Sequence, residues 1–426
     1  MKHFILGLAV SACALSPALV YAQDAHPSHS NRPVSLLMNN LEDSVKVIEA
    51  FKLNSPAAYN VTDAPRFAIV GKNNLFYLGI GATIKGTLGF DFGDPIDNPN
   101  EFVTSDINMN PVPGNGGKVN ISAQQSNVYL NMVALPDNPN KIGLYVSMNL
   151  LGNNYTPALQ YAYLKYRGFT VGYDYSLFAD MAAGVPTIDY EGPNAMTSIP
   201  NAVIDYRHSF NKHWSIGAGL EMPIASYTVG HNTAVVNQRV PDVPFYAQYS
   251  WGNNSWVRMS GIVRNMIYRD LATNSNRDKV GWGVKVSGSA EIIPNLRAYY
   301  QGAFGNGITS YFQDLEGCGL DMTPDADAVG RLNAVMAWGA YAGLQYNFSP
   351  KVYCSATYSH LRNYAKKYSG DWPEQYRYGQ YAVGNVFYNI NSVLTWGIEY
   401  VWGRRVDMNG LSHHDNRIQT MLQLSL

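Results

Sequence analysis

Cysteine, charged residues and long apolar runs are all scarce in this chain of 426 residues. Only three residues are cysteine, and 14% are charged, whereas a typical soluble domain has roughly 25% charged residues. Beyond residue 22 no apolar run reaches the length of about 18 residues that a membrane-spanning helix needs. The 30 basic and 31 acidic side chains nearly cancel, so net charge indicates neither a nucleic-acid partner nor any other highly charged one.

Aromatic residues and glycine are abundant instead. Aromatics make up 13% of the chain, 31 of them tyrosine, and there are 38 glycines. Mean hydropathy is nevertheless slightly negative. Few charges, many aromatics and middling hydropathy are typical of strands that present one face to lipid and the other to water.

The arrangement of polarity along residues 75–426 carries the strongest structural signal. About sixteen short segments alternate between polar and apolar residues, and the gaps between them are alternately short and long. In outer-membrane barrels, short turns face the periplasm and long loops face outside. The sequence therefore predicts an all-β fold, a transmembrane antiparallel β-barrel with both chain ends in the periplasm. The expected strands are 75–92, 120–135, 140–150, 158–166, 168–178, 201–209, 213–221, 244–250, 255–269, 279–292, 295–304, 333–348, 351–361, 377–390, 393–402 and 413–426.

Residues 1–22 have the pattern of a Sec signal peptide. Lys2 supplies the positive start, residues 4–19 are mostly apolar, and residues 20–22 (VYA) form a small-residue cleavage site. A competing interpretation is a lipoprotein signal at residues 10–13 (VSAC). Either signal predicts export, and together with the barrel pattern it places the protein in the cell outer membrane.

Residues 23–74 are expected to form a periplasmic segment ahead of the barrel. Its apolar residues recur at spacings of 4, 3, 4 and 3, which predicts a helix over residues 34–53; they are Val34, Met38, Leu41, Val45 and Ile48. Such a stripe is compatible with a short coiled coil between copies of the chain. It is equally compatible with a single amphipathic helix that rests on another part of the protein.

Cys318 and Cys354 are the only cysteines outside the signal segment. In the strand assignment Cys318 lies in an external loop, whereas Cys354 lies near the periplasmic end of a strand. The two thiols are therefore expected to be too far apart to form a disulfide.

Residues 71–99 (GKNNLFYLGIGATIKGTLGFDFGDPIDNP) carry a resemblance to a known family. A glycine-rich strand with an inward lysine, an aromatic-Asp-aromatic step and a long first loop make this segment similar to the start of DcaP-type outer-membrane porins. The resemblance implies a trimer of sixteen-stranded barrels with a periplasmic N-terminal helical segment. It also implies a preference for small anionic solutes such as dicarboxylates, although phosphate-selective porins have a similar outline.

The last strand resembles the C-terminal signal of outer-membrane proteins. Ile418, Thr420, Leu422, Leu424 and Leu426 share one face, but the chain ends in leucine, where this signal usually ends in an aromatic residue. Through this strand the barrel-assembly machinery is an expected partner. Outer-membrane lipid and lipopolysaccharide are the expected surroundings of the barrel.

The chemistry of a porin lies in the charged groups that line its lumen. A cation on the lipid face costs about 2–4 kcal/mol at the bilayer midplane, so alternation assigns most strand cations to the lumen. The expected pore-lining residues are Lys85, Lys165, Arg207, Arg258, Arg264, Lys285, Arg297, Tyr299 and Arg417.

Four of these cations lie on three consecutive predicted strands and could form one basic wall: Arg258, Arg264, Lys285 and Arg297. Such a wall would replace part of the hydration shell of an anion. The alternative is that inward arginines pair with acids on nearby strands and merely brace the barrel. Asp205 and Glu291 are suitably placed for such pairing.

The long loop at residues 179–200 is the expected constriction, because its glycines and prolines permit tight folding. Asp189 and Glu191 on this loop could face the basic wall and create a transverse field. Alternatively, the loop could cover the external mouth of the barrel without entering it.

The function predicted from these features is passive diffusion of small hydrophilic solutes, with a bias toward anions such as dicarboxylates or phosphate. A structural or surface-interaction barrel with a plugged lumen is the alternative. A barrel hydrolase ranks lowest, because Asp205 and Ser209 face inward while His208 on the same strand faces lipid. No catalytic residue, cofactor, metal site or nucleic-acid partner is expected.

Overall fold

The computed structural model describes residues 35–36, 44–59, 64–71, 74–252, 254–325, 327–366 and 375–426. The expected signal peptide at residues 1–22 and the lipoprotein alternative at residues 10–13 lie outside the described residues and stay predictions. Among the described residues, no helix is both long and apolar enough to cross a membrane.

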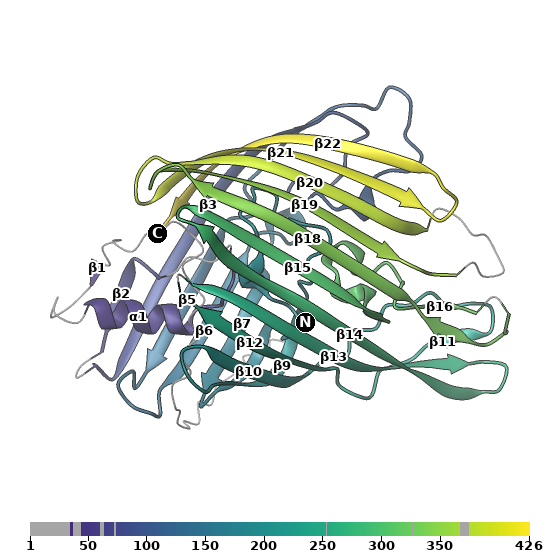
Figure 1. Ribbon diagram of the computed structural model, residues 1–426, viewed down its shortest axis with the longest axis horizontal. Helices are drawn as coiled ribbons and strands as arrows, with labels where there is room; N and C mark the ends of the chain where they lie inside the picture. The colour runs from purple at the N-terminus through teal and green to yellow at the C-terminus, as the bar shows by residue number, and fades with distance from the viewer. Residues whose placement is uncertain are drawn as a thin grey trace, which may run out of the picture.

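The main body is a closed barrel of sixteen antiparallel strands, as the sequence predicted (Figure 1). Closure is made by β22, which pairs with β3 from Arg417 opposite Asp91 to Ser425 opposite Thr83. The strands of the wall are β3 (Phe76–Asp91), β4 (Lys118–Ser122) with β5 (Asn127–Ala134), β6 (Ile142–Asn149), β7 (Ala158–Tyr166), β8 (Phe169–Tyr175), β9 (Pro200–Ser209), β10 (Trp214–Glu221), β12 (Val243–Trp251), β13 (Ser255–Asp270), β14 (Ser275–Ile293), β15 (Leu296–Asn306), β18 (Met336–Asn347), β19 (Val352–Asn363), β20 (Tyr376–Asn389), β21 (Leu394–Asp407) and β22 (Ser412–Ser425).

Each expected strand has a counterpart in this wall, with small differences at the ends. The second is interrupted, because β4 pairs with the external half of β3 and β5 with the periplasmic half. The external ends of two strands are longer than expected: β14 begins at Ser275 and β21 ends at Asp407. Both extensions are mostly polar, with Val406 as the one large apolar residue, so they lack the apolar alternation that marks a strand in lipid.

The faces of the strands follow the predicted alternation. On β14 the apolar side chains Val280, Trp282, Val284 and Val286 are exposed on the outer surface, whereas Lys285 between them is buried on the inner side. The periplasmic turns are tight. Between β7 and β8, Arg167 and Gly168 both have positive φ angles (48° and 83°), the conformation of a two-residue hairpin turn whose twist matches its strands.

The wall is much lower on one side than on the other. Strands β5, β6, β8 and β10 have 8, 8, 7 and 8 residues, whereas β13 has 16 and β14 has 19. At the external ends of the tall strands lie short elements formed by the long loops, as Figure 1 shows: β11 (Thr233–Val235), which pairs with β13, and the β16 (Met322–Pro324) and β17 (Leu332–Ala334) pair.

The N-terminal segment differs from the expected helix over residues 34–53. Ser35–Leu36 form a short strand, β1, which pairs with β2 (Phe67–Val70), and β2 in turn pairs with β3. The helix, α1, spans Ser44–Asn54, so its start was placed too early, and residues 37–43 lie outside the described residues. Strand pairing by residues 35–36 explains the difference, because their backbone groups bond to β2. Val47 and Phe51 bury α1 against the barrel wall. Neither belongs to the predicted apolar stripe, whose Val45 is 73% exposed, so the helix rests on the barrel through a different face from the one the stripe predicted.

Candidate functional site

The loop at residues 176–199, between β8 and β9, folds into the barrel and is buried almost throughout. Inward side chains of the far wall fix its backbone. The Glu399 carboxylate accepts hydrogen bonds from the backbone N–H groups of Ile188 (2.7 Å) and Asp189 (2.8 Å). Ser355 and Asn385 both donate to the carbonyl of Pro186, at 2.9 and 2.8 Å. We call these residues the lumen loop.

The lumen loop also reaches the opposite, lower wall. The hydroxyl of Tyr190 accepts hydrogen bonds from Asn149 on β6, at 3.1 Å, and from Gln160 on β7. Near the start of the loop, η5 (Met181–Ala183) lies against the tall wall, where Asp180 accepts from the Trp256 indole and the Ser287 hydroxyl. The loop therefore crosses the barrel interior and contacts both sides of it.

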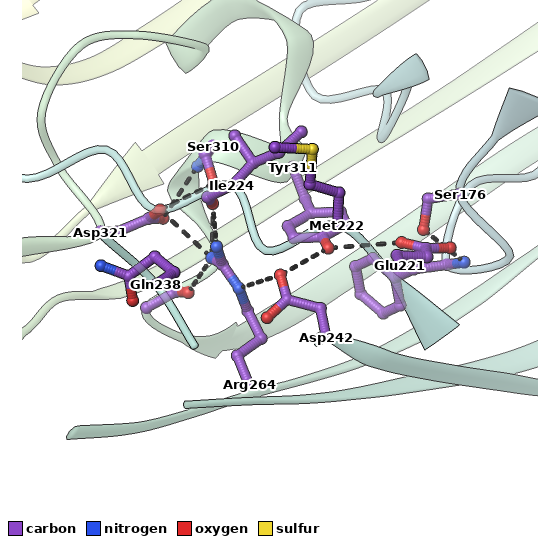
Figure 2. A network of polar contacts seen from close by, with 12 residues as sticks. Ser176, Glu221, Met222, Ile224, Gln238, Asp242, Arg264, Ser310, Tyr311 and Asp321 are labelled. Carbon is purple, nitrogen blue, oxygen red and sulfur yellow. Dashed lines mark hydrogen bonds and ion pairs between the residues drawn. The ribbon is translucent and has the colours of Figure 1, made fainter. Parts of the chain in front are cut away.

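Arg264, one of the predicted pore-lining cations, is fully buried beneath external loops. Its guanidinium lies 2.9 Å from Asp242 and 3.2 Å from Asp321, and its charged end lies over the ring of Tyr311 (Figure 2). Gly307 and Ser310 accept further hydrogen bonds from it. This arrangement ties three loop segments to β13, and neither the guanidinium nor the two carboxylates are accessible to solute.

Three more predicted cations also hold loops in place. Arg417 pairs with Asp91 at 2.5 Å and donates to the carbonyl of Asn98. The ammonium groups of Lys85 and Lys285 donate to lumen-loop oxygens: the Ile188 carbonyl (3.0 Å) for Lys85 and the Thr197 hydroxyl (3.1 Å) for Lys285. All three side chains are buried.

The expected basic wall of Arg258, Arg264, Lys285 and Arg297 is therefore not a continuous water-facing surface. Loops that the alternation pattern does not describe cover Arg264 and Lys285. Arg297 is buried near a periplasmic turn, where it donates to the Asn254 carbonyl and the Ser289 hydroxyl. Tyr299, also buried, donates its hydroxyl hydrogen to Gln345 at 2.9 Å.

Lys165, Arg207 and Arg258 are the predicted cations that keep contact with water, and we call them the basic arc. Arg207 bonds to Asp174 and Asp205, each at 2.9 Å, and its side chain is 24% exposed while theirs are 9% and 1% exposed. Arg258, 12% exposed, lies 3.5 Å from Asp180, which is 1% exposed. In each pair the guanidinium is more exposed than the carboxylate.

Aromatic rings support the basic arc. The Arg258 guanidinium lies 4.5 Å from the ring of Tyr246, and the Lys165 ammonium 4.8 Å from the ring of Tyr163. All three cations lie near the periplasmic ends of β7, β9 and β13, within four residues of a short turn. They therefore line one side of the periplasmic part of the lumen.

Asp189 of the lumen loop does not face the expected basic wall. Asp189 accepts hydrogen bonds from the Phe102 and Gly192 backbone and from the Tyr381 hydroxyl, beside β20 and far from β13 along the wall. The loop acid that does meet Arg258 is Asp180. Sequence analysis missed Asp180, because a loop without regular alternation gives no signal for where a side chain points.

Glu191 lies close to several other acidic side chains of the described loops. Both carboxylate oxygens of Glu191 are buried without a hydrogen-bond partner. Burial, together with Asp314 and Asp189 nearby, raises the pKa of Glu191 well above its usual range. Burial likewise raises the pKa of Glu101, on the first external loop, to about 7, and the charge of Asp189 adds to the shift. At pH 7 a large fraction of the Glu101 carboxyl group is therefore protonated.

The N-terminal segment enters the barrel from the periplasmic side, which the sequence analysis did not foresee. Asn54, at the end of α1, donates to Asn131 on β5 at 2.7 Å and accepts from Tyr163 and Lys165 on β7. Beyond it, Tyr59 donates its backbone N–H to the Met181 carbonyl of the lumen loop at 3.1 Å.

The ring of Tyr59 is buried against the lumen loop. It fits there because Gly184 has no side chain: a Cβ at that position would lie 2.1 Å from the ring. The short stretch from Asn54 to Tyr59 thus connects the periplasmic helix directly to the loop inside the barrel.

The features of an enzyme or metal site do not come together. Asp205 is committed to Arg207, while His208 lies on the outer surface against the rings of Tyr206 and Phe210. In the part of the chain that the structure describes, no three metal-binding side chains lie close enough to hold an ion. Cys318 and Cys354 are both free, as expected.

Comparison with known proteins is consistent with this geometry. A model of the porin subfamily matches residues 123–421. No curated protein matches the chain by sequence.

Solved structures of outer-membrane proteins share the fold. The outer membrane channel DcaP of Acinetobacter baumannii superimposes with a TM-score of 0.71 at 17% identity, over 83% of this chain and 99% of that one. The anion-selective porin from Comamonas acidovorans superimposes with a TM-score of 0.51 at 7% identity, over 82% of this chain and 100% of that one. The trimer form of OmpT from Vibrio cholerae superimposes with a TM-score of 0.50 at 11% identity, over 82% of this chain and 99% of that one.

Replacing the buried Arg264 by glutamine should destabilise the folded protein. Asp242 and Asp321 would remain buried without their cation, and breaking a buried ion pair in this way typically costs about 3–5 kcal/mol. Urea unfolding in detergent micelles measures the change. Lys118→Gln is the control, since it removes a cation from an ion pair with Asp97 in which both side chains are exposed, and it should leave the unfolding midpoint unchanged. Equal stability of Arg264→Gln and the wild type would contradict the bracing role.

Replacing Tyr59 by alanine should free the N-terminal segment from the lumen loop. Truncating a buried aromatic ring typically costs about 3–5 kcal/mol of packing. We expect faster trypsin cleavage at Lys52 and a larger single-channel conductance in planar bilayers. Val45→Ala, at a position that is 73% exposed, is the control and should change neither quantity. Faster cleavage with unchanged conductance would show that this segment lies outside the ion path.

Proposed function

The chain belongs to the porin subfamily and is an outer-membrane channel, and from that premise we propose that small hydrophilic solutes diffuse passively through it with a bias toward anions. One observation carries the anion bias. In the basic arc the guanidinium groups of Arg207 and Arg258 are partly exposed to the lumen, while the carboxylates that pair with them are almost fully buried.

Which group of each ion pair is exposed matters more than the net charge of the pair. Electrostatic interactions weaken steeply with distance in salt water, so a passing solute responds mainly to the charged groups that it can approach closely. In the basic arc those groups are cations, and Lys165 adds an ammonium that donates to the backbone carbonyls of Asn54 and Ser55. Small carboxylates and phosphate have the charge and the acceptor oxygens that such groups bind.

We propose the lumen loop as the constriction. Its contacts with Glu399 on one wall and with Asn149 and Gln160 on the other support this role. A homotrimer is proposed as well, supported by the trimer form of the structurally similar OmpT. Export by a Sec signal peptide at residues 1–22 completes the proposal.

The plugged-lumen barrel is the second candidate, and one observation favours it. Tyr59 and the lumen loop are buried against each other inside the barrel, so the N-terminal segment and the loop together occupy part of the passage. Single-channel conductance of the full chain separates the two candidates, because a plugged barrel stays closed in planar bilayers.

Removing the exposed cations should reduce anion selectivity. For the variant Arg207→Gln/Arg258→Gln we expect a several-fold lower ratio of chloride to potassium permeability, since each charge contributes up to about 1 kcal/mol at 4 Å in water. Reversal potentials in a salt gradient measure the ratio. Lys118→Gln/Arg331→Gln removes two cations from the external side and is the control. A wild-type ratio in the first variant would exclude the basic arc from selectivity.

Acidification should increase anion selectivity. The pKa of Glu101 is raised to about 7 by burial, so this carboxyl is charged at pH 8 and mostly neutral at pH 6. Loss of its negative charge lowers the barrier to anions, and Glu191, whose pKa is also raised, acts in the same direction. Reversal potentials between pH 8 and pH 6 should shift toward anions, and Glu101→Gln should reduce the shift. A pH-independent ratio would contradict this assignment.

A further inference from the structure

A row of polar side chains crosses the outer surface of the barrel near the external ends of β19 to β22. His360 lies opposite Gln380, Gln380 opposite Arg404, and Arg404 opposite His414. Neighbouring strands lie about 4.8 Å apart, so the row spans about 14 Å. Arg362 lies two residues farther along β19, toward the external end. We call these five residues the outer polar row; Figure 1 shows the four strands side by side.

The contacts of adjacent residues establish that the row faces outward. Ser359, next to His360, donates to Asn194 of the lumen loop, and Tyr381, next to Gln380, donates to Asp189. Since successive side chains on a strand point to opposite faces, the residues of the row lie on the outer face. None of them is buried within the barrel.

Aromatic rings hold two members of the row in position. The Arg362 guanidinium lies 4.7 Å from the ring of Tyr364, whose hydroxyl accepts a hydrogen bond from Trp338 at 3.1 Å. The ring of His360 is stacked between Trp338 and Tyr378, at centroid distances of 5.1 and 5.4 Å. Stacking fixes these side chains while leaving polar edges available for a ligand.

The two arginines of the row have no acidic partner among the residues that the structure describes. Arg404 donates to the Ser412 hydroxyl at 2.8 Å, and the Nε atom of Arg362 is buried without a hydrogen-bond partner. By contrast, the inward arginines Arg207, Arg264 and Arg417 all pair with carboxylates. An unpaired cation is unfavourable on a lipid-facing wall, so an anion from the surroundings would stabilise the row.

Aromatic side chains just below the row indicate its depth in the membrane. On the outer face, Tyr358 precedes His360 by two residues, and Trp402 precedes Arg404 by two; Tyr400 lies one step deeper. Girdles of aromatic residues mark the boundary of the hydrocarbon region in outer-membrane barrels. The row lies on the external side of these rings, at the level of the lipid headgroups.

We propose that the outer polar row binds a phosphate group of the glycolipid in the outer leaflet. Arg362 and Arg404 each offer several N–H donors in the planar arrangement that matches phosphate oxygens, and His360 and His414 add ring nitrogens at either side. The site faces the membrane and has no connection to the lumen, so its occupant is lipid and not a transported solute.

Binding of purified lipid A to the full chain in detergent tests this site. Thermal unfolding is followed with bis-phosphorylated lipid A, with its dephosphorylated form and with inorganic phosphate, and mass spectrometry measures the glycolipid retained per barrel after extraction. The variant is Arg362→Gln/Arg404→Gln. Arg269→Gln/Arg331→Gln, which removes two arginines from other external segments, is the matched control. Wild-type conductance and oligomer size, measured for both variants, show that the barrels are folded.

The phosphorylated lipid should raise the unfolding temperature of the wild type and of the control, and the dephosphorylated form should not. The row variant should bind about tenfold more weakly for each arginine lost and retain correspondingly less glycolipid. Equal binding by the row variant and the control, or equal stabilisation by dephosphorylated lipid, would overturn the proposal. Equal stabilisation by inorganic phosphate would instead indicate a free anion as the occupant, and a changed oligomer size would indicate a contact between copies of the chain.

Discussion

Backbone hydrogen bonds in a membrane have no water to replace them, and this constraint shapes the whole molecule. The pairing of β22 with β3 satisfies the last free strand edge and closes the sheet. Closure leaves the chain with only two environments for its strand side chains, lipid and lumen. A residue's position along a strand then decides which of the two it enters.

The same constraint applies to the loops that enter the barrel. The lumen loop has little regular structure of its own, so side chains of the wall satisfy much of its backbone. Glu399 accepts from two of its N–H groups, and Lys85, Ser355 and Asn385 donate to its carbonyls. Several inward polar residues therefore form hydrogen bonds with the loop and are not free to bind a solute. For this reason, fewer cations are exposed to water in the lumen than the alternation of the strands places on their inner face.

Alternation predicted the parts of the structure that lipid determines and missed those that other loops determine. The strands and their faces follow from the polarity pattern, because a wrong face would bury a charge in hydrocarbon. The placement of Asp321 beside Arg264 depends on the path of a loop about 57 residues farther along the chain, which no periodic pattern describes. Tyr59 was missed for a related reason, since its partner Gly184 belongs to a segment with no strand register.

The arginines on the two faces of the wall differ in what balances their charge. Inside, where Arg264 and Arg417 are shielded from water, the chain supplies carboxylates of its own, because an unpaired buried charge is costly. In the basic arc water reaches the guanidinium of Arg207, so pairing with Asp174 and Asp205 leaves part of its field available to solutes. Outside, Arg362 and Arg404 have no carboxylate partner from the described chain. Since Arg207, Arg264 and Arg417 are paired with carboxylates of the chain, the lack of such a partner for Arg362 and Arg404 among the described residues supports an anion that the membrane itself provides.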